Sequence, residues 1–276
     1  MMSAFLERLK SRIYFWLKVL KNFRGLTLGS EFNLWISVLI DSFLYAFSST
    51  RFNPRLVLKG LFLYRVKRLG IIVVRGGTDD LYNMVPGREG DVDMFIRSCL
   101  NNGSVFVDVG ANVGYYTLIA SKLVDSSGRV YAIEPIPSTA TILRANVKLN
   151  KCFNVIVHEV AAYSSKGKLT LRVPGLWYGS ASILQNGLSI TVNAAMLDEL
   201  LQNEIFVDCI KIDVEGAELE VLRGARNVLN RTKYLVLEIS RDVTEILEEL
   251  RKAGFECRKA HFTTYILCKQ SKTRYN

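Results

Sequence analysis

Apolar and polar residues follow one pattern from residue 70 onward. Short apolar runs separated by turns predict strands at 71–74, 105–109, 130–133, 155–160, 210–212, 235–239 and 265–268. Helical spacing of apolar residues lies between several of them, at 115–124, 139–150, 217–229 and 243–252. This alternation predicts an α/β fold with a doubly wound, mostly parallel sheet. Gly254 ends the last helix, and the runs 255–259 and 265–268 then predict an antiparallel C-terminal hairpin.

The first 69 residues follow a different pattern. Within 4–23, apolar residues recur every three or four positions with basic residues between them, which predicts a basic amphipathic helix. The stretch 32–47 is apolar around a central Asp41, and a charge in that place argues against a membrane-spanning helix. We therefore expect a basic, largely helical N-terminal segment at residues 1–69 and an α/β domain at residues 70–276.

Charge separates the same two parts of the chain. The 276 residues carry a net charge of +10, and residues 1–75 account for all of it, with 13 basic and three acidic residues (13 − 3 = +10). Two interpretations of the helix at 4–23 stay open: it packs on the domain and presents its lysines to water, or it makes peripheral contact with a membrane.

Cysteine usage bears on the compartment. The five cysteines never occur as Cys-x-x-Cys, which predicts neither a zinc site nor a disulfide framework. A cytoplasmic location fits best, at the inner membrane surface if the helix at 4–23 binds lipid.

The strongest chemical signal is VFVDVGANVG at 105–114, a strand that enters a glycine turn and then a helix. Glycine at position 110 lets the backbone approach a ligand closely. Nicotinamide enzymes need a glycine where this chain has Asn112, and Asp108 would repel a pyrophosphate. A cationic or zwitterionic ligand therefore fits better. A second strand ends in Glu134, 24 residues after Gly110, where doubly wound folds use an acid to bind a ribose diol.

These motifs, together with VYAIEPIPSTATILRANVKLN, GSASI, LDELL, IKIDVEGAELEVLRGA and LVLEIS, resemble the FkbM-type branch of the Rossmann-like S-adenosylmethionine-dependent methyltransferases over about residues 70–255. The resemblance implies seven strands with the last one antiparallel, and methylation of a hydroxyl on a sugar, polyketide or glycolipid. It places the methionine part of S-adenosylmethionine near Asp108 and the ribose on Glu134. We assign the cofactor site to Asp108, Gly110, Asn112, Gly114, Glu134, Pro135 and Glu89.

Methyl transfer to a hydroxyl requires a group that removes its proton. Asp213 and Glu215 share one face at the end of the fourth parallel strand, and Glu238 ends the next strand, so we predict that catalysis uses these three carboxylates. Capping of the helix that starts at Ala217 is the alternative role for the first two. The family often has a histidine where this chain has Ser240, which leaves the proton acceptor open. A divalent cation held by the carboxylates is an alternative that we do not predict.

Two loop regions complete the expected site. Residues 163–205 contain a glycine-rich, aromatic stretch, and we interpret it as a lid or substrate wall in which Trp177 and Tyr178 stack on a sugar; a packed hairpin explains them equally well. The loop 86–90 places Arg88 and Glu89 before the first motif, as charged contacts to the methionine part of the cofactor.

Two rival functions remain. A nucleic-acid methyltransferase would use the basic front to bind phosphates, but the sequence after the fourth strand, Asp-Val-Glu-Gly, differs from that of enzymes that methylate base amino groups, so nucleic acid is an unlikely partner. A non-catalytic cofactor-binding scaffold with a membrane-associating front is the other. We expect a small-molecule or glycan hydroxyl as the substrate.

Overall fold

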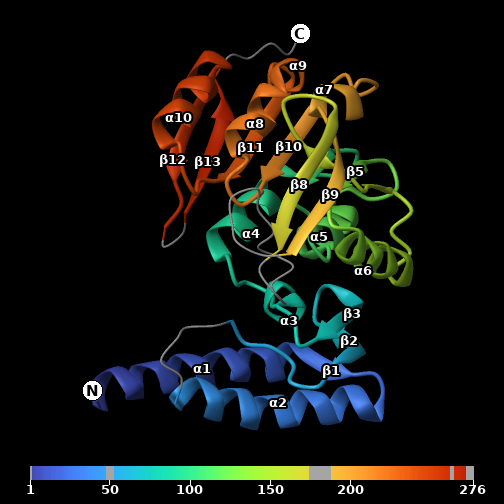
Figure 1. Cartoon of the computed structure of the whole chain (residues 1–276). Coiled ribbons are helices and arrows are strands. Elements are labelled where there is room, and N and C mark those ends of the chain that lie inside the picture. The colour runs from blue at the N-terminus through green and yellow to red at the C-terminus, as the bar shows by residue number, and fades with distance from the viewer. Residues whose placement is uncertain (1, 48–52, 174–187, 262–263, 272–276) are drawn as a thin grey trace.

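The computed structural model describes residues 2–47, 53–173, 188–261 and 264–271, and its main element is a seven-stranded sheet (Figure 1). The strands are β4 Val105–Val109, β5 Arg129–Ile133, β6 Val155–His158, β10 Val207–Ile212, β11 Thr232–Glu238, β12 Phe255–Lys259 and β13 Tyr265–Gln270. They are ordered β12-β13-β11-β10-β4-β5-β6. All are parallel up to β11, whereas β13 is antiparallel to β11 and β12. The predicted α/β fold and its C-terminal hairpin are confirmed.

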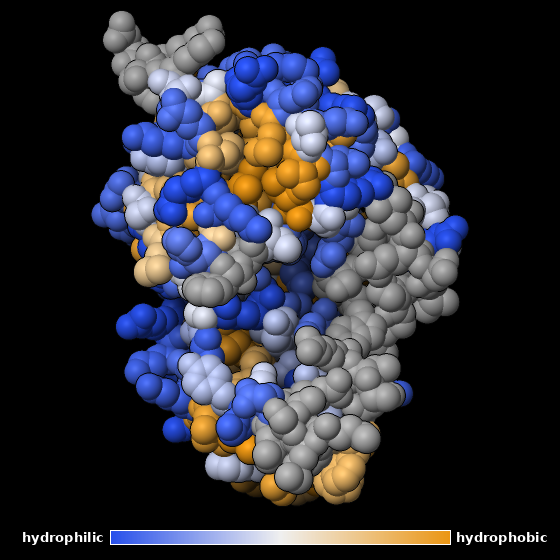
Figure 2. Space-filling view, turned by 90° about the vertical axis from the view of Figure 1, so that its left-hand side faces the viewer, coloured by the Kyte–Doolittle hydropathy of each residue, from blue (hydrophilic) through white to orange (hydrophobic). Residues whose placement is uncertain are grey.

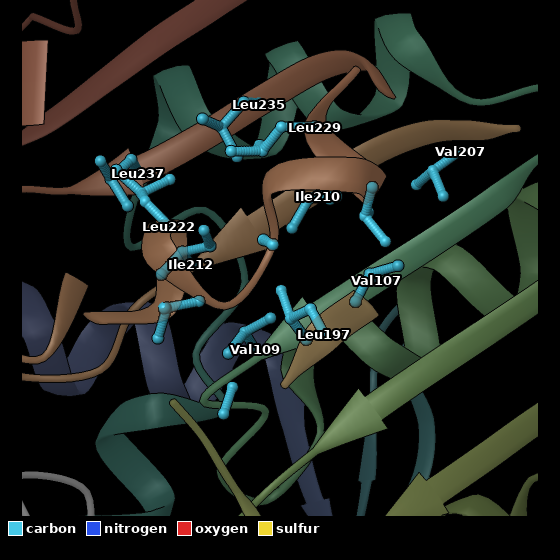
Figure 3. Packing of buried hydrophobic residues seen from close by; sticks show 14 of the residues in the cluster. Val107, Val109, Leu197, Val207, Ile210, Ile212, Leu222, Leu229, Leu235 and Leu237 are labelled. Atoms are coloured by element: carbon cyan, nitrogen blue, oxygen red, sulfur yellow. The ribbon is translucent and has the colours of Figure 1, made fainter. Parts of the chain in front are cut away.

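Helices cover both faces of this sheet, since its buried strands present apolar side chains alternately to either side. They are α4 Gly90–Cys99, α5 Tyr115–Val124, α6 Pro137–Leu149, α7 Leu197–Leu200, α8 Glu218–Arg223, α9 Arg226–Leu229 and α10 Val243–Lys252. On one face, Val107, Ile210 and Leu235 belong to the cluster formed with α7, α8, α9 and α10 (Figure 3). On the other, Phe106 and Val236 pack with α4 and α5.

The helix expected at 217–229 is interrupted. Gly224 and Ala225 separate α8 from α9. A Cβ on Gly224 would lie 2.0 Å from the carbonyl oxygen of Tyr163, so the backbone passes very close to a neighbouring segment at this point. The prediction of one continuous helix was wrong because it could not include this tertiary contact.

A small second sheet is inserted between β6 and β10. Its strands are β7 Ala161–Ala162, β8 Gly167–Val173 and β9 Leu188–Ala195, in the order β7-β9-β8. Leu169 and Leu171 of β8 line the pocket described below, as a wall would. Trp177 and Tyr178 lie outside the described residues.

The front of the chain forms an N-terminal unit, defined here as residues 2–47 and 53–76, at the lower end of Figure 1. It contains α1 Met2–Asn22, β1 Phe23–Gly25, α2 Leu28–Phe47, β2 Gly60–Val66 and β3 Gly70–Gly76. The three strands make an antiparallel sheet, and the β2–β3 hairpin spans the boundary expected after residue 69. Among the described helices, none is both long and apolar enough to cross a bilayer.

Besides apolar packing, two asparagines, one on α6 and one at its C-cap, bind the N-terminal unit to the main domain. The amide of Asn146 accepts a hydrogen bond from Val73 N (2.6 Å) and donates to the carbonyls of Val73 (3.2 Å) and Val113 (2.9 Å). One turn later, Asn150 accepts a hydrogen bond from Ile71 N and donates one to Ile71 O. Because a primary amide offers a donor and an acceptor, these side chains pair with β3 as a neighbouring strand would.

One expectation about cysteine was wrong. Cys257 on β12 and Cys268 on β13 lie opposite each other in the hairpin and form a disulfide, with Cα atoms 4.1 Å apart. Cys99, Cys152 and Cys209 are free and buried. The pairing depends on the register of two strands, which the spacing of the cysteines in the sequence does not reveal. This pair gives no support to a reducing compartment.

We predict that Asn146→Ala lowers the free energy of unfolding by about 1–3 kcal/mol, since it removes a buried amide and leaves the part-buried backbone of Val73 without its partners. Urea denaturation would measure the change. Asn102→Ala serves as the control, because Asn102 is exposed, and its stability should stay within about 0.5 kcal/mol of wild type. Equal stability of both variants would show that the asparagine contacts do not hold the unit.

Candidate functional site

A pocket lies at the carboxyl edge of the central strands, against the N-terminal unit. All three predicted catalytic residues, Asp213, Glu215 and Glu238, line it. So do six of the seven predicted cofactor residues, namely Asp108, Gly110, Asn112, Glu134, Pro135 and Glu89. The pocket is also lined by Asn53 of the N-terminal unit and by four residues between this unit and α4, namely Asp79, Tyr82, Asn83 and Arg88. The structure thus gathers nearly all predicted site residues in one cavity, while Gly114 forms the N-cap of α5 instead.

Gly110 is required by the protein itself. Its φ is +76°, in the left-handed region, and a Cβ there would lie 1.8 Å from the carbonyl oxygen of Asp213. Asp213 N also donates to Val109 O (3.0 Å), so the turn after β4 and the turn after β10 pack backbone to backbone. The sequence predicts room for a ligand at this glycine, whereas in the structure its tightest described neighbour is the adjacent turn.

Asp108 is a buried carboxylate with one oxygen left for a ligand. Its Oδ2 accepts a hydrogen bond from Thr117 Oγ1 (2.6 Å). Its Oδ1 has no hydrogen-bond partner among the described residues, and Lys211 Nζ lies 3.9 Å away. Burial raises the pKa of Asp108, against the opposing effect of the Lys211 charge. A cationic group in the pocket would satisfy this oxygen, because buried polar atoms are seldom left unpaired.

Glu134 closes the opposite side of the glycine turn. Its carboxylate accepts hydrogen bonds from Asn112 N (2.9 Å) and Ile136 N (3.0 Å). Asn112 presents this N–H because its φ is +50°, a conformation that asparagine tolerates better than most residues. Burial raises the pKa of Glu134 to about 7 despite these two bonds. Each oxygen keeps a lone pair that can accept a further hydrogen bond from a ligand hydroxyl.

Arg88 and Glu89 form an ion pair in the wall of the pocket, at 2.6 Å between Nη2 and Oε1. The second oxygen of Glu89 accepts a hydrogen bond from the Tyr116 hydroxyl (2.8 Å). The two charged residues expected at the amino-acid end of the ligand therefore lie together, and their charges largely offset each other.

Lys211 and Tyr265 belong to the site although the sequence analysis did not select them. Lys211 Nζ lies 3.0 Å from Asp213 Oδ2, and the Tyr265 hydroxyl donates to the same oxygen at 2.6 Å. Burial alone would raise the pKa of Asp213, but the Lys211 charge and the hydrogen bonds from Glu238, Tyr265 and Lys211 hold it below its usual value. A lysine between two isoleucines of a buried strand was the available signal for Lys211.

Glu238 and Glu215 differ from Asp213 in their affinity for protons. Burial, the charge of Asp213 and a hydrogen bond to it raise the pKa of Glu238 to about 9. Burial and the charges of Asp213, Glu218 and Asp79 raise the pKa of Glu215 to about 7. Near neutral pH the cluster therefore has an ionised Asp213, a protonated Glu238 and a Glu215 that titrates.

Carboxylate oxygens of Asp213, Glu215 and Glu238 lie within 4.8 Å of one another. Such a group can attract a divalent cation. Lys211 Nζ, 3.0 Å from Asp213 Oδ2, already offsets part of the repulsion among these carboxylates. The expectation that no metal is needed stays a prediction.

Among the described residues, α8 begins at Glu218 without a side-chain cap at its N-cap residue, Ala217. Instead, the buried carboxylate of Glu218 accepts hydrogen bonds from Gly216 N (2.8 Å) and from the Ser240 hydroxyl (3.1 Å). Ser240, which replaces the histidine common in the family, thus fixes the turn after β10. Glu215 lies in this turn with φ +50°, a strained conformation for a non-glycine residue.

Comparison with known proteins identifies the family of this chain. The family model described as Methyltransferase FkbM domain matches residues 108–257, which is more than half of the chain. A hexuronic acid methyltransferase, AglP, from Haloferax volcanii is 29% identical over 170 residues, covering 59% of this chain and 69% of that protein. Methyltransferase 1 from Beauveria bassiana is 27% identical over 161 residues, covering 48% of this chain and 64% of that protein.

Among solved structures, methyltransferase FkbM from Methylobacillus flagellatus KT superimposes with a TM-score of 0.45 at 20% sequence identity. The match covers 61% of this chain and 44% of that one.

We predict that Gly110→Ala destabilises the protein and disrupts the pocket, because alanine would have to adopt a left-handed conformation against the Asp213 carbonyl. The conformation alone costs about 1–2 kcal/mol, so the free energy of unfolding should fall by at least that amount. The melting temperature should fall with it. Gly167→Ala is the matched control, since nothing lies within 4 Å of its added Cβ. Equal melting temperatures of the two variants would contradict the role given to the contact between the turns.

Proposed function

Because the chain belongs to the FkbM methyltransferase domain family and is an S-adenosylmethionine-dependent methyltransferase, we propose that it methylates a hydroxyl group on a sugar, a glycolipid or another small metabolite. The observation that supports this proposal best is the pairing of Asp108 and Glu134 on either side of the glycine turn, in the same pocket as Glu215. One end of the pocket suits the cofactor and the other suits a proton acceptor.

The residues present fit the cofactor. Asp108 Oδ1, a buried oxygen without a hydrogen-bond partner among the described residues, would accept a hydrogen bond from the ammonium of the methionine part. Glu134 would accept hydrogen bonds from the ribose hydroxyls of S-adenosylmethionine. The Arg88–Glu89 pair would contact its charged amino-acid end. When bound, S-adenosylmethionine supplies a methyl group activated by its sulfonium centre. The protein then has to orient the acceptor oxygen and take up its proton.

Glu215 is the proposed proton acceptor. A general base works best when its pKa is near the working pH, and Glu215 has a pKa of about 7. Asp213 is a poor candidate, since Lys211 and Tyr265 hold its pKa low. Glu238 is protonated near neutral pH and donates to Asp213. Asp213 and Glu238 therefore position the cluster, and the negative charge of Asp213 helps to keep the affinity of Glu215 for protons high.

Two observations support a sugar or another small molecule as the acceptor. The relative from Haloferax volcanii is named for a hexuronic acid. The pocket is also rich in carboxylates, and its bases Arg88 and Lys211 are paired with Glu89 and Asp213. Nucleic acid would bring phosphates to this acidic edge, where the two basic side chains of the described lining are already paired, which disfavours the rival function.

A transfer assay with methyl-labelled S-adenosylmethionine tests the proposal. Acceptors would include neutral hexosides, uronic acid glycosides and RNA. We expect label in a sugar, in a form that survives mild alkali, because an ether is stable there and a methyl ester is not. Label that appears only in RNA, or only as an alkali-labile ester, would contradict the proposal.

For Glu215→Gln we predict a fall in kcat of about 10²- to 10⁴-fold with little change in cofactor binding, since general-base catalysis contributes that much. In the wild type, kcat at saturating cofactor should rise with pH through about 7 and then level off, because only ionised Glu215 accepts a proton. Glu256→Gln, at an exposed position on β12, is the control. A variant that retains the wild-type rate and pH profile would exclude Glu215 as the base.

A further inference from the structure

Helix α2 has its polar side inside and its apolar side outside. Its buried residues are Ser30, Asn33, Leu34, Ser37 and Asp41. Its large exposed residues are Leu28, Phe32, Trp35, Leu39, Ile40, Phe43, Leu44 and Phe47. A helix on the surface of a water-soluble domain shows the opposite arrangement, because burial of apolar area provides most of its stability. The orientation of α2 therefore needs an explanation.

The buried polar residues fix this orientation. Each of three polar side chains accepts a hydrogen bond from a backbone N–H. The bonds run from Leu63 N to Ser30 Oγ (3.0 Å), from Leu58 N to Asn33 Oδ1 (3.1 Å) and from Val57 N to Ser37 Oγ (2.9 Å). These bonds satisfy the backbone that runs into β2. A rotated α2 would take these partners away from three part-buried N–H groups, which would destabilise the unit.

A buried ion pair adds to the same constraint. Asp41 Oδ2 lies 3.3 Å from Arg12 Nε and accepts a hydrogen bond from Trp16 Nε1 (2.9 Å). Asp41 is the charge that argued against a spanning helix, and the structure turns it toward α1. The opposite side of α2 is consequently free of charge along its whole length after Glu31.

The exposed apolar residues form one continuous stripe. Leu28, Phe32, Trp35, Leu39 and Phe43 are three or four positions apart, so they follow one side of α2. Leu28 is 93% exposed, Leu39 72% and Phe43 64%. We call these five residues the α2 face. In Figure 2, apolar surface in orange lies along the lower edge of the molecule, where Figure 1 places α1 and α2.

Basic residues dominate the exposed charges of the N-terminal unit. Its exposed lysines and arginines are Lys10, Lys21, Arg24, Lys59, Arg65, Lys67 and Arg68. Among the residues with described side chains, Glu7 is the exposed acid of this unit, while Asp41 is buried. An apolar helix face on a strongly cationic unit is complementary to a surface with anionic groups above an apolar interior.

We propose that the α2 face inserts into the interfacial layer of an anionic lipid bilayer, parallel to its surface. Trp35, Phe32 and Phe43 suit this layer, where aromatic side chains gather, and the basic residues of the unit attract anionic headgroups. Residues 4–23 were the segment expected to contact a membrane. In the structure its Trp16, Val19 and Phe23 are buried, and its described exposed apolar residues, Ile13, Tyr14 and Leu17, are fewer than those of α2, so α2 is the better surface.

A second copy of the chain fits the face less well. A two-fold dimer through α2 would bring the same cationic unit of both copies together, and like charges across an interface are costly. The bilayer proposal also does not depend on methyl transfer, since it rests on α2 and its surroundings alone.

Flotation with lipid vesicles tests the proposal. The whole protein is mixed with vesicles of phosphatidylcholine and phosphatidylglycerol, or of phosphatidylcholine alone. We expect wild-type protein to float with the anionic vesicles and far less with the neutral ones. Leu39→Glu/Phe43→Glu should reduce partitioning by more than about tenfold, because the favourable burial of two large apolar side chains is lost.

The matched control is Phe153→Glu/Ile205→Glu, which replaces apolar residues that are 92% and 91% exposed on the main domain. This variant should float like wild type. As a second readout, the tryptophan emission that disappears in Trp35→Phe should shift to shorter wavelength when anionic vesicles are added. Circular dichroism checks that each variant is folded.

Three outcomes would overturn the proposal. The wild type remains with the unbound fraction, or Leu39→Glu/Phe43→Glu floats as well as the control. Alternatively, light scattering shows a wild-type dimer that this variant converts to monomer without any vesicle binding, which would assign the α2 face to a second copy.

Discussion

The site depends on the contact between two backbone turns. β4 and β10 are parallel neighbours, with Asp108 opposite Lys211 in the register, and the turn after β4 passes so close to Asp213 that position 110 tolerates only glycine. This contact brings the cofactor-side acid and the cluster at the end of β10 into one cavity. If the two turns were farther apart, Asp108 and Asp213 could not share the charge of Lys211.

The distribution of charge in the pocket follows from this proximity. One buried ammonium faces Asp108, Asp213 and the neighbouring acids, and it cannot neutralise all of them. Asp213 takes the shortest contact and stays ionised, whereas Glu238 and Glu215 respond by holding protons more tightly. Carboxylates of one type thereby acquire different functions from their surroundings, as is common in active sites.

Local patterns in the sequence predicted much of this fold. β4 and α5 match the expected bounds, and the predicted acids lie at the carboxyl edge as expected, because strand ends and glycine turns are encoded within a few residues. Features that depend on tertiary contacts were not predicted. Tyr265 reaches Asp213 only through the antiparallel register of β13, Cys257 meets Cys268 for the same reason, and the inverted α2 reflects bonds to a later segment.

The central claim is that the buried oxygen of Asp108 receives the cationic end of the cofactor. Calorimetry with S-adenosylmethionine and with methylthioadenosine, which lacks the amino-acid part, tests this claim most directly. Asp108→Asn should weaken S-adenosylmethionine binding by roughly ten- to a hundredfold, the value of a hydrogen bond to a charged group, and leave methylthioadenosine unaffected. Equal weakening of both ligands, no weakening of either, or tighter binding of NAD to the wild type would contradict the account.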